Sequence, residues 1–227
     1  MKNLIYKEFK LCMQPLVWIF FAFVLMLLIP NYIYLVPCFF VGNAIFQTMQ
    51  VGAVNNDVLF SNLLPVSKRD TVKAKYLFVI CVELIMTALY VGMIFVNHKL
   101  IGSPNMAGID ACPALIGGCF LIHAVFNAIF LPVFYKSGFK AGRAFVFSAI
   151  AVFAVMFVFE GIFIAAGAAA DKSALFAAIE STIDCWPETG RALSAQLIFT
   201  GAFAVLYAVV TWLSYLRSAS IFEKSDI

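Results

Sequence analysis

Six apolar stretches of about the length that crosses a bilayer constrain this chain more than any other feature of its sequence. They lie at 15–29, 32–54, 76–97, 111–134, 144–170 and 195–216. A helix needs about 20 apolar residues, at a rise of about 1.5 Å each, to cross the hydrocarbon core. The chain is 64% hydrophobic and 12% charged, whereas soluble domains average roughly 45–50% apolar and about 25% charged residues. The sequence therefore predicts an all-α polytopic membrane protein, with six transmembrane helices in a single transmembrane domain over 1–227.

Positive residues are distributed unevenly between the two ends of these stretches. Of the 15 Lys and Arg, all but Lys99, Lys172 and Arg191 fall in the terminal segments and in the loops after the second and fourth stretches. Positive residues near spanning segments stay in the cytoplasm. We therefore expect a multi-pass protein of the cell (plasma) membrane with both termini in the cytoplasm. The net charge of +3 is too small to favour nucleic acid as a partner.

The segment 1–13 has the pattern of an interfacial amphipathic helix. On a helix, Ile5, Phe9 and Cys12 fall on one side, and Asn3, Lys7 and Lys10 fall on the other. Such a helix lies in the plane of the membrane interface with its apolar face down. A short polar tail is the alternative interpretation.

The segment 55–75 is the most polar part of the chain and lies between the second and third stretches. Pro65 interrupts a continuous helix, and Ser67 is a suitable N-cap for a helix that continues into the third stretch. The pattern predicts a short helix, a break at Pro65 and a basic helix that enters the membrane. An ordinary positive-inside loop is the alternative. Apolar residues outside the bilayer favour a docking element instead.

The same segment resembles a pattern in the permease subunits of type 2 ABC exporters. Asp57 precedes Leu-Pro-Val-Ser-Lys-Arg at 64–69, and Val72 and the pair at 75–76, Lys-Tyr, follow. The start Lys-Asn-Leu-Ile-Tyr-Lys-Glu-Phe-Lys is also similar to the N-terminal interfacial helix of those proteins, and the resemblance covers essentially the whole chain. Lys68 departs from the pattern, because many relatives have Arg directly after Ser.

The resemblance implies that 55–75 is a coupling helix and loop that contacts a separate ATPase subunit, present in two copies. The expected ATPase-coupling residues are Asp57, Leu59, Phe60, Leu63, Leu64, Pro65, Lys68 and Arg69. No G-x-x-x-x-G-K-[ST] motif occurs in the chain, so ATP and Mg²⁺ are expected on the partner and no cofactor in this pore-forming, non-enzymatic subunit. A second permease subunit, in a homodimer or close heterodimer, is also implied. Within the type 2 class, the chain resembles exporters of amphipathic peptide toxins and bacteriocin self-protection systems of Gram-positive bacteria.

Polar residues inside the apolar stretches are candidates for a conduit or gate, because ionisable groups are costly there. The candidates are Asn43, Gln47, Glu83, His123, Asn127 and Glu160. Asn43 and Gln47 are four apart and share a helix face. Hydrogen bonding between packed helices is the alternative for these residues.

Other features admit more than one interpretation. The segment 171–194 predicts an outer amphipathic element, either a gate or a surface helix. Cys119 and His123 are four apart, but two ligands do not make a metal site. Cys112 and Cys185 both fall near the outer face and could form a disulfide. A stand-alone secondary transporter or channel is the alternative function, although no internal repeat supports it.

Overall fold

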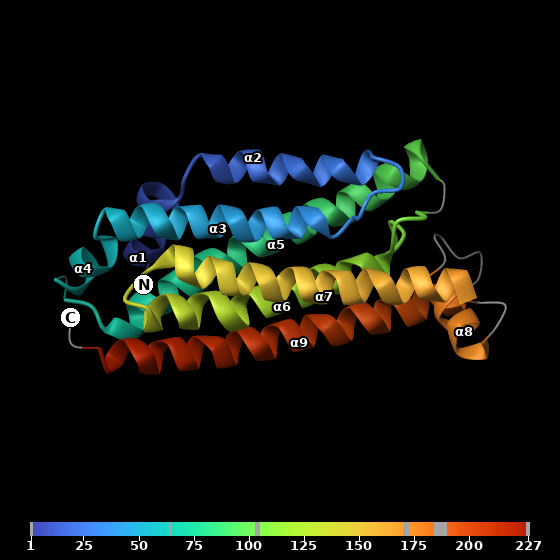
Figure 1. Cartoon of the computed structure of the whole chain (residues 1–227). Coiled ribbons are helices and arrows are strands. Elements are labelled where there is room, and N and C mark those ends of the chain that lie inside the picture. The colour runs from blue at the N-terminus through green and yellow to red at the C-terminus, as the bar shows by residue number, and fades with distance from the viewer. Residues whose placement is uncertain (1, 64, 103–104, 170–172, 184–189, 226–227) are drawn as a thin grey trace.

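The computed structural model describes residues 2–63, 65–102, 105–169, 173–183 and 190–225, and every regular element within these ranges is helical. The long helices run side by side, with α4 and both chain ends at one end of the bundle and α8 at the other (Figure 1). The elements are α1 (Lys2–Lys7), the π-helical η1 (Glu8–Cys12), α2 (Leu16–Ala22), the 3₁₀-helical η2 (Phe23–Leu28), α3 (Val36–Val54), α4 (Asp57–Asn62), α5 (Lys68–Leu100), α6 (Pro113–Lys136), α7 (Ala141–Ala169), α8 (Ala174–Ile183) and α9 (Gly190–Glu223).

Four helices of the described chain are long and apolar enough to cross a membrane. They are Lys68–Leu100, Pro113–Lys136, Ala141–Ala166 and Leu193–Glu223. The shorter apolar segment Leu16–Leu28 and the 19-residue α3 lie alongside them (Figure 1). The prediction of an all-helical protein with several apolar helices is confirmed, and the count of six spans stays a prediction.

Local chemistry sets the boundaries around α4. Asn56 has a left-handed backbone with φ 55°, which separates α3 from α4, and Asn tolerates this conformation better than most residues. Ser67 has an extended backbone, and its side chain accepts a hydrogen bond from the Asp70 N–H at 3.1 Å. This bond satisfies one of the free donors at the start of α5. The predicted order of short helix, break around Pro65 and Ser67-capped helix is confirmed.

The core of the bundle forms around α6, which packs against α7 on one side and α9 on the other. Gly117 permits the close approach of α9, because a methyl group there would lie 2.9 Å from the Phe199 ring. Small residues at helix contacts give this close packing in membrane proteins. Between α3 and α7, Phe46 and Phe145 stack with their ring centroids 4.3 Å apart.

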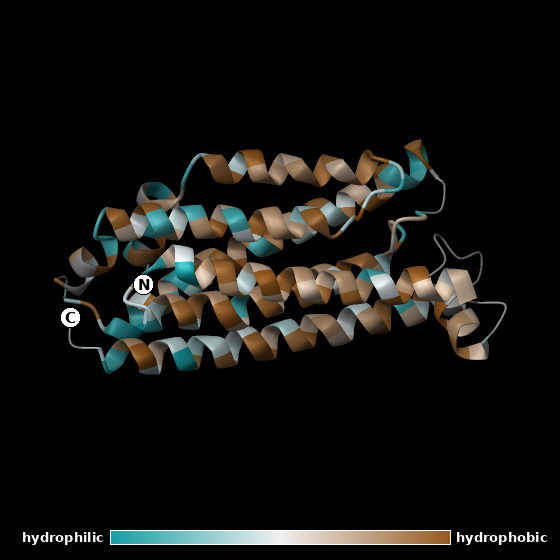
Figure 2. Cartoon of the chain, in the orientation of Figure 1, coloured by the Kyte–Doolittle hydropathy of each residue, from teal (hydrophilic) through white to brown (hydrophobic). Residues whose placement is uncertain are grey.

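Apolar residues also cover much of the outside of the bundle. Ile150 of α7 and Ile198 of α9 are 64% and 72% exposed. Figure 2 shows brown, hydrophobic residues along the full length of the long helices, with teal residues concentrated at the end that carries α4. A surface of this kind suits contact with lipid and is rare on soluble monomers.

The N-terminal segment is helical, but its faces differ from the amphipathic prediction. Leu4 and Glu8 are the buried residues, and the side chain of Lys7, which was predicted on the polar face, is only 12% exposed. The reason is that both charged groups have partners on α4 and α5. An interfacial position for 1–13 stays a prediction.

Candidate functional site

The exposed face of α4 and its C-cap residue Leu63 present two of the predicted coupling residues. Phe60 is 61% exposed and Leu63 is 83% exposed, whereas Val58 is buried against the bundle. The side chains of Leu59 and Leu64 lie outside the described part of the structure. The short helix therefore turns one apolar side inward as an anchor and offers the other to solvent or a partner.

A buried ionic cluster attaches α4 to the rest of the bundle. Lys75 Nζ lies 2.8 Å from Asp57 Oδ2 and 3.1 Å from Glu8 Oε2. Lys7 Nζ lies 2.7 Å from Asp57 Oδ1 and 3.2 Å from Glu8 Oε1, and it donates to Ser61 Oγ at 2.7 Å. Two ammonium groups and two carboxylates thus balance one another where α1, η1, α4 and α5 meet. We call Lys7, Glu8, Asp57 and Lys75 the ionic cluster.

The ionic cluster holds the Asp57 carboxyl in its ionised form. Burial by itself would raise the pKa of the Asp57 carboxyl, but the neighbouring Lys75 and Lys7 hold that pKa below its usual range. Opposite charges within about 4–6 Å favour ionisation in this way. A buried charge that lost its partner would be strongly destabilising, so the cluster fixes the position of α4.

The cluster also contains a group of potential metal ligands. Ligand atoms of Glu8, Cys12 and Asp57 lie within 4.8 Å of one another. However, both carboxylates already bind lysine, and burial raises the pKa of the Cys12 thiol to about 12. Metals bind the thiolate, so these residues suit an ion-pair cluster better than a metal site. Cys119 and His123 are not part of this group.

Two other coupling candidates, Lys68 and Arg69, have partners at the end of α9. Lys68 Nζ donates to the Ser225 carbonyl oxygen at 2.7 Å, and Arg69 Nε lies 2.6 Å from Glu223 Oε1. The Arg69 side chain is 66% exposed, so its ion pair is worth little energetically. The resemblance implies that Lys68 and Arg69 contact an ATPase, whereas in the structure both contact their own chain. Pro65 is exposed between α4 and α5.

A second polar cluster lies deep among the spanning helices α5, α6 and α9. Glu83 Oε2 accepts hydrogen bonds from Asn127 Nδ2 at 2.9 Å and from the Tyr207 hydroxyl at 2.7 Å. His123 Nδ1 lies 3.7 Å from Glu83 Oε1, and Asn127 also donates to Thr211 Oγ1 at 3.3 Å. We call these five residues the inner polar cluster. The structure brings together three residues that the sequence identified separately.

Tyr207 and Thr211 were not identified from the sequence. They belong to a polar stripe on α9 that continues through Ser214 and Ser218, which both hydrogen-bond to the Tyr76 hydroxyl, at 2.7 and 2.8 Å. The spacing of three and four residues on an otherwise apolar helix was the signal for this face. These contacts favour hydrogen bonding between helices for Glu83, His123 and Asn127, whose conduit role stays a prediction.

Glu160 lies at the other end of the bundle, away from the inner polar cluster. Its Oε2 accepts a hydrogen bond from the Ile109 N–H at 2.7 Å, and the carboxylate packs directly over Gly108. Asn105 Nδ2 in the same loop donates to the carbonyl oxygens of Tyr32 and Ile109. Glu160 therefore fixes the loop that precedes α6, and its gate role stays a prediction.

The amides of α3 form the third polar group. Asn43 and Gln47 are half-buried and Gln50 is exposed, and none of their side chains hydrogen-bonds to another residue that the structure describes. We call these three amides the amide stripe of α3. The stripe lies between two faces of the helix, one where Phe40 packs on η2 and one where Phe46 packs on α7. Hydrogen-bonding groups at this depth are costly without a partner. The stripe therefore needs water, substrate or another protein surface.

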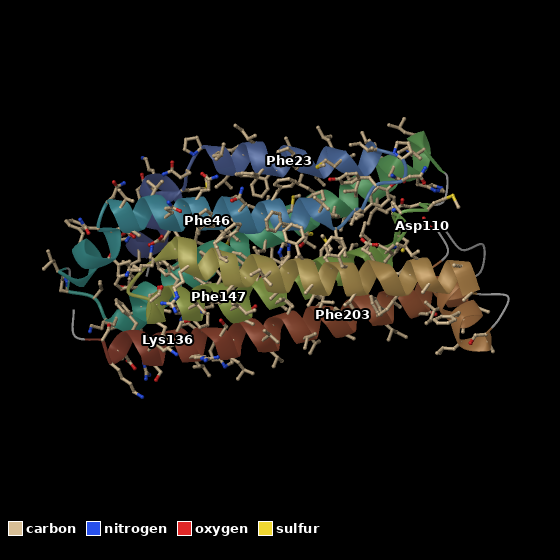
Figure 3. The ribbon with its side chains drawn as sticks, viewed as in Figure 1. Phe23, Phe46, Asp110, Lys136, Phe147 and Phe203 are labelled. Atoms are coloured by element: carbon tan, nitrogen blue, oxygen red, sulfur yellow. The ribbon has the colours of Figure 1, made fainter. Side chains whose placement is uncertain are left out.

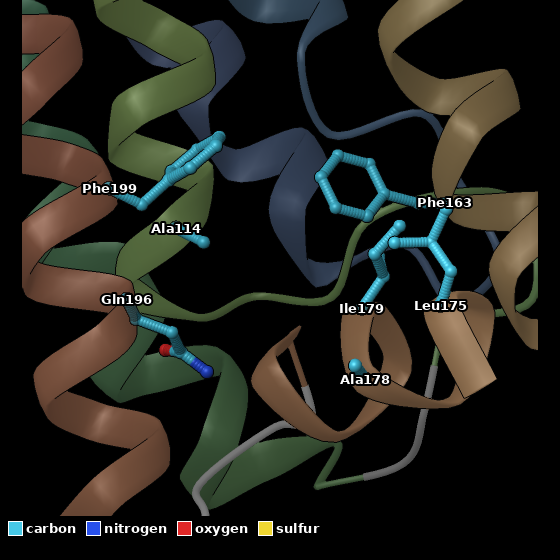
Figure 4. A pocket seen from close by; sticks show the side chains of 7 residues that line it. All are labelled: Ala114, Phe163, Leu175, Ala178, Ile179, Gln196 and Phe199. Carbon is cyan, nitrogen blue, oxygen red and sulfur yellow. The ribbon is translucent and has the colours of Figure 1, made fainter.

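The short helix α8 covers an apolar cavity of about 270 Å³ at the end of the bundle opposite α4. α8 lies within the predicted outer segment 171–194. Cys185 lies outside the described residues, so the possible disulfide with Cys112 does too. Figure 4 shows Leu175 and Ile179 of α8 opposite Phe199 and Gln196 of α9. The cavity is lined by Ala114, Phe163, Leu175, Ala178, Ile179, Gln196 and Phe199.

A comparison with known protein families identifies the family of this chain. A model of the ABC-2 family transporter proteins matches residues 3–223. The chain belongs to the ABC-2 transporter family. No curated protein and no solved structure matches it.

The ABC-2 assignment explains the general architecture. Members of this family are membrane transport components, and the family implies an ATPase partner and a membrane location. The apolar helices of this ABC-2 permease agree with that location, and the multi-pass prediction is confirmed. The resemblance that the sequence carries around Leu-Pro-Val-Ser is confirmed at the level of the family.

Proposed function

We propose that this ABC-2 permease exports an amphipathic peptide or another hydrophobic substrate, with ATP and Mg²⁺ bound by two copies of a separate ATPase subunit. The observation that carries the proposal is the exposed apolar side of α4, held in place by the ionic cluster. Phe60 and Leu63 would enter a groove on the ATPase, because buried apolar anchors supply most interface energy.

The proposed movement passes from α4 into the membrane through fixed contacts. Asp57 of α4 is tied to Lys75 on α5, so a displacement of α4 displaces the start of α5. Further along α5, Glu83 binds Asn127 of α6 and Tyr207 of α9. In this mechanism α5, α6 and α9 move together when the ATPase subunits close.

The substrate pathway is proposed to lie along α3, at the contact with a second permease subunit. The amide stripe of Asn43, Gln47 and Gln50 supports this position, because it is accessible and its polar groups lack partners among the described residues. Aromatic and aliphatic residues of η2, α3 and α7 flank the stripe. Amides among apolar side chains suit an amphipathic substrate better than a sugar.

The proposed topology has six spans and cytoplasmic termini. The segment Leu16–Leu28 and α3 would supply the two spans beyond the four long apolar helices. The basic residues at the α4 end of the bundle support a cytoplasmic position for that end, where an ATPase would have access to α4.

Co-purification with the ATPase subunit tests the proposal. Phe60→Asp with Leu63→Asp should give a folded, membrane-inserted permease that no longer retains the ATPase. Leu100→Asp with Met106→Asp is the matched control, because these residues are 71% and 85% exposed at the opposite end of the bundle. Retention of the ATPase by the α4 variant at the level of the control would refute the coupling role.

A further inference from the structure

A groove opens between the C-terminal end of α6 and the N-terminal end of α7, at the end of the bundle that carries the basic loops. It has a volume of about 500 Å³. Figure 3 shows Lys136 and Phe147 near this end of the bundle. The groove is lined by Ile129, Val133, Lys136, Ser137, Arg143 and Phe147. Its walls are therefore apolar, and its rim carries two positive charges.

The positive charges at this rim have no acidic partner among the described residues. Lys7, Arg69 and Lys75 each form an ion pair, whereas Lys136 and Arg143 form none within the described chain. The sequence also contains no Asp or Glu between Asp110 and Glu160, so α6, the loop and most of α7 supply no local compensation. Lys140, in the same loop, adds a third positive charge nearby.

A ligand that matches this groove needs an anionic head and an apolar tail. Phe147 is 50% exposed and forms part of the wall, so a soluble anion would leave this apolar surface in contact with water or lipid. A phospholipid would place its phosphate between Lys136 and Arg143 and its acyl chain against Ile129 and Val133. Basic pockets between spanning helices bind anionic headgroups in this way.

We propose that the groove between α6 and α7 is a binding site for an anionic phospholipid of the adjacent leaflet. The proposal is independent of the exported substrate and of the ATPase contact. The bound headgroup would neutralise the positive charges at the rim. The acyl chain would fill the groove beside the loop that joins α6 to α7. The lipid would thus belong to the folded permease as a structural ligand.

Quenching by brominated lipid gives a local readout of this site. The full chain carrying Phe147→Trp is purified in uncharged detergent, and its fluorescence is compared with that of the unsubstituted chain to isolate the new tryptophan. Dibrominated phosphatidylglycerol should quench that tryptophan at a lipid fraction roughly tenfold lower than dibrominated phosphatidylcholine does. Equal quenching by the two lipids would overturn the proposal.

Charge variants separate the groove from general surface charge. Lys136→Gln with Arg143→Gln should bring the preference for phosphatidylglycerol close to one. Arg217→Gln with Lys224→Gln removes two positive charges from the end of α9 and the residue that follows it, without touching the groove, and it should leave the preference unchanged. An equal loss in both variants would assign the effect to bulk electrostatics and overturn the proposal.

A second measurement covers the case in which the tryptophan disturbs the groove. Mass spectrometry of the chain without Phe147→Trp, under conditions that preserve bound lipid, should detect retained phosphatidylglycerol that Lys136→Gln with Arg143→Gln loses. Displacement by millimolar inorganic phosphate would indicate a free-anion site and overturn the lipid assignment. Loss of the retained lipid on ATPase binding would reassign this face to a protein contact, with the same consequence.

Discussion

Replacement of Lys75 by Met tests whether the ionic cluster holds α4 in place. Met has a similar length and stays apolar, so the change removes the charge with little change in volume. The Lys75 side chain is 3% exposed and lies 2.8 Å from Asp57 and 3.1 Å from Glu8. After the change, the carboxylates of Glu8 and Asp57 would share the single ammonium group of Lys7.

The expected loss of stability is large because a buried charge is left without its partner. Breaking a buried ion pair from one side costs about 3–5 kcal/mol. For a chain of this size, each kcal/mol lowers Tm by about 2–4 °C, so Lys75→Met should lower Tm by roughly 6–20 °C. Glu8→Gln in the same chain removes the surplus negative charge and should restore roughly half of that loss.

Thermal unfolding in detergent, followed by size-exclusion chromatography, measures these differences. Lys73→Met is the control, because Lys73 is exposed on the same helix and belongs to no ion pair within the described residues. The reasoning would fail if Lys75→Met were as stable as Lys73→Met. It would also fail if Glu8→Gln gave no recovery.

Three further predictions concern other parts of the chain. The pKa of Asp57 is lower in the folded than in the unfolded protein, so its contribution to the free energy of unfolding is present above the unfolded pKa and is lost as pH falls. At pH values below about 4, Tm should therefore decrease. In Asp57→Asn, Tm should depend less on pH. Gly108→Ala should lower Tm, because a methyl group there would lie 1.9 Å from the Glu160 carboxylate, and Glu160→Ala in the same chain should relieve that clash; simple additivity of the two changes would contradict the contact. A membrane-impermeant thiol reagent should label Ser173→Cys but not Ser67→Cys in intact cells, in a chain without its native cysteines; labelling of the latter would reverse the proposed orientation.

Local sequence was sufficient to predict the path of the chain through 55–75. Ser67 caps α5 and the chain breaks around Pro65 because these effects depend on neighbours within a few residues. The apolar character of the long helices was likewise evident from composition. The 3₁₀ geometry of η2 and the π geometry of η1 were not, because both arise from packing at the ends of short helices.

The charge partners could not be predicted, because they depend on contacts between distant segments. Lys75 looks the same in sequence whether it marks a cytoplasmic loop or binds Glu8, and Glu8 was not identified at all. Glu83 was identified as costly in the membrane, but its partners on α6 and α9 lie 44 and 124 residues away. Spacing along one helix predicted shared faces, such as that of Asn43 and Gln47, but no contact between different helices.

The ionic cluster also has a consequence for the biosynthesis of this permease. Glu8 and its partner Lys75 are separated by 67 residues, so the N-terminal helix leaves the ribosome long before Lys75 is synthesised. Glu8 must remain hydrated while Leu16–Leu28 and α3 enter the bilayer. Its ion pair with Lys75 can form only when the start of α5 is present, so the cluster is complete only after the first third of the chain has been synthesised.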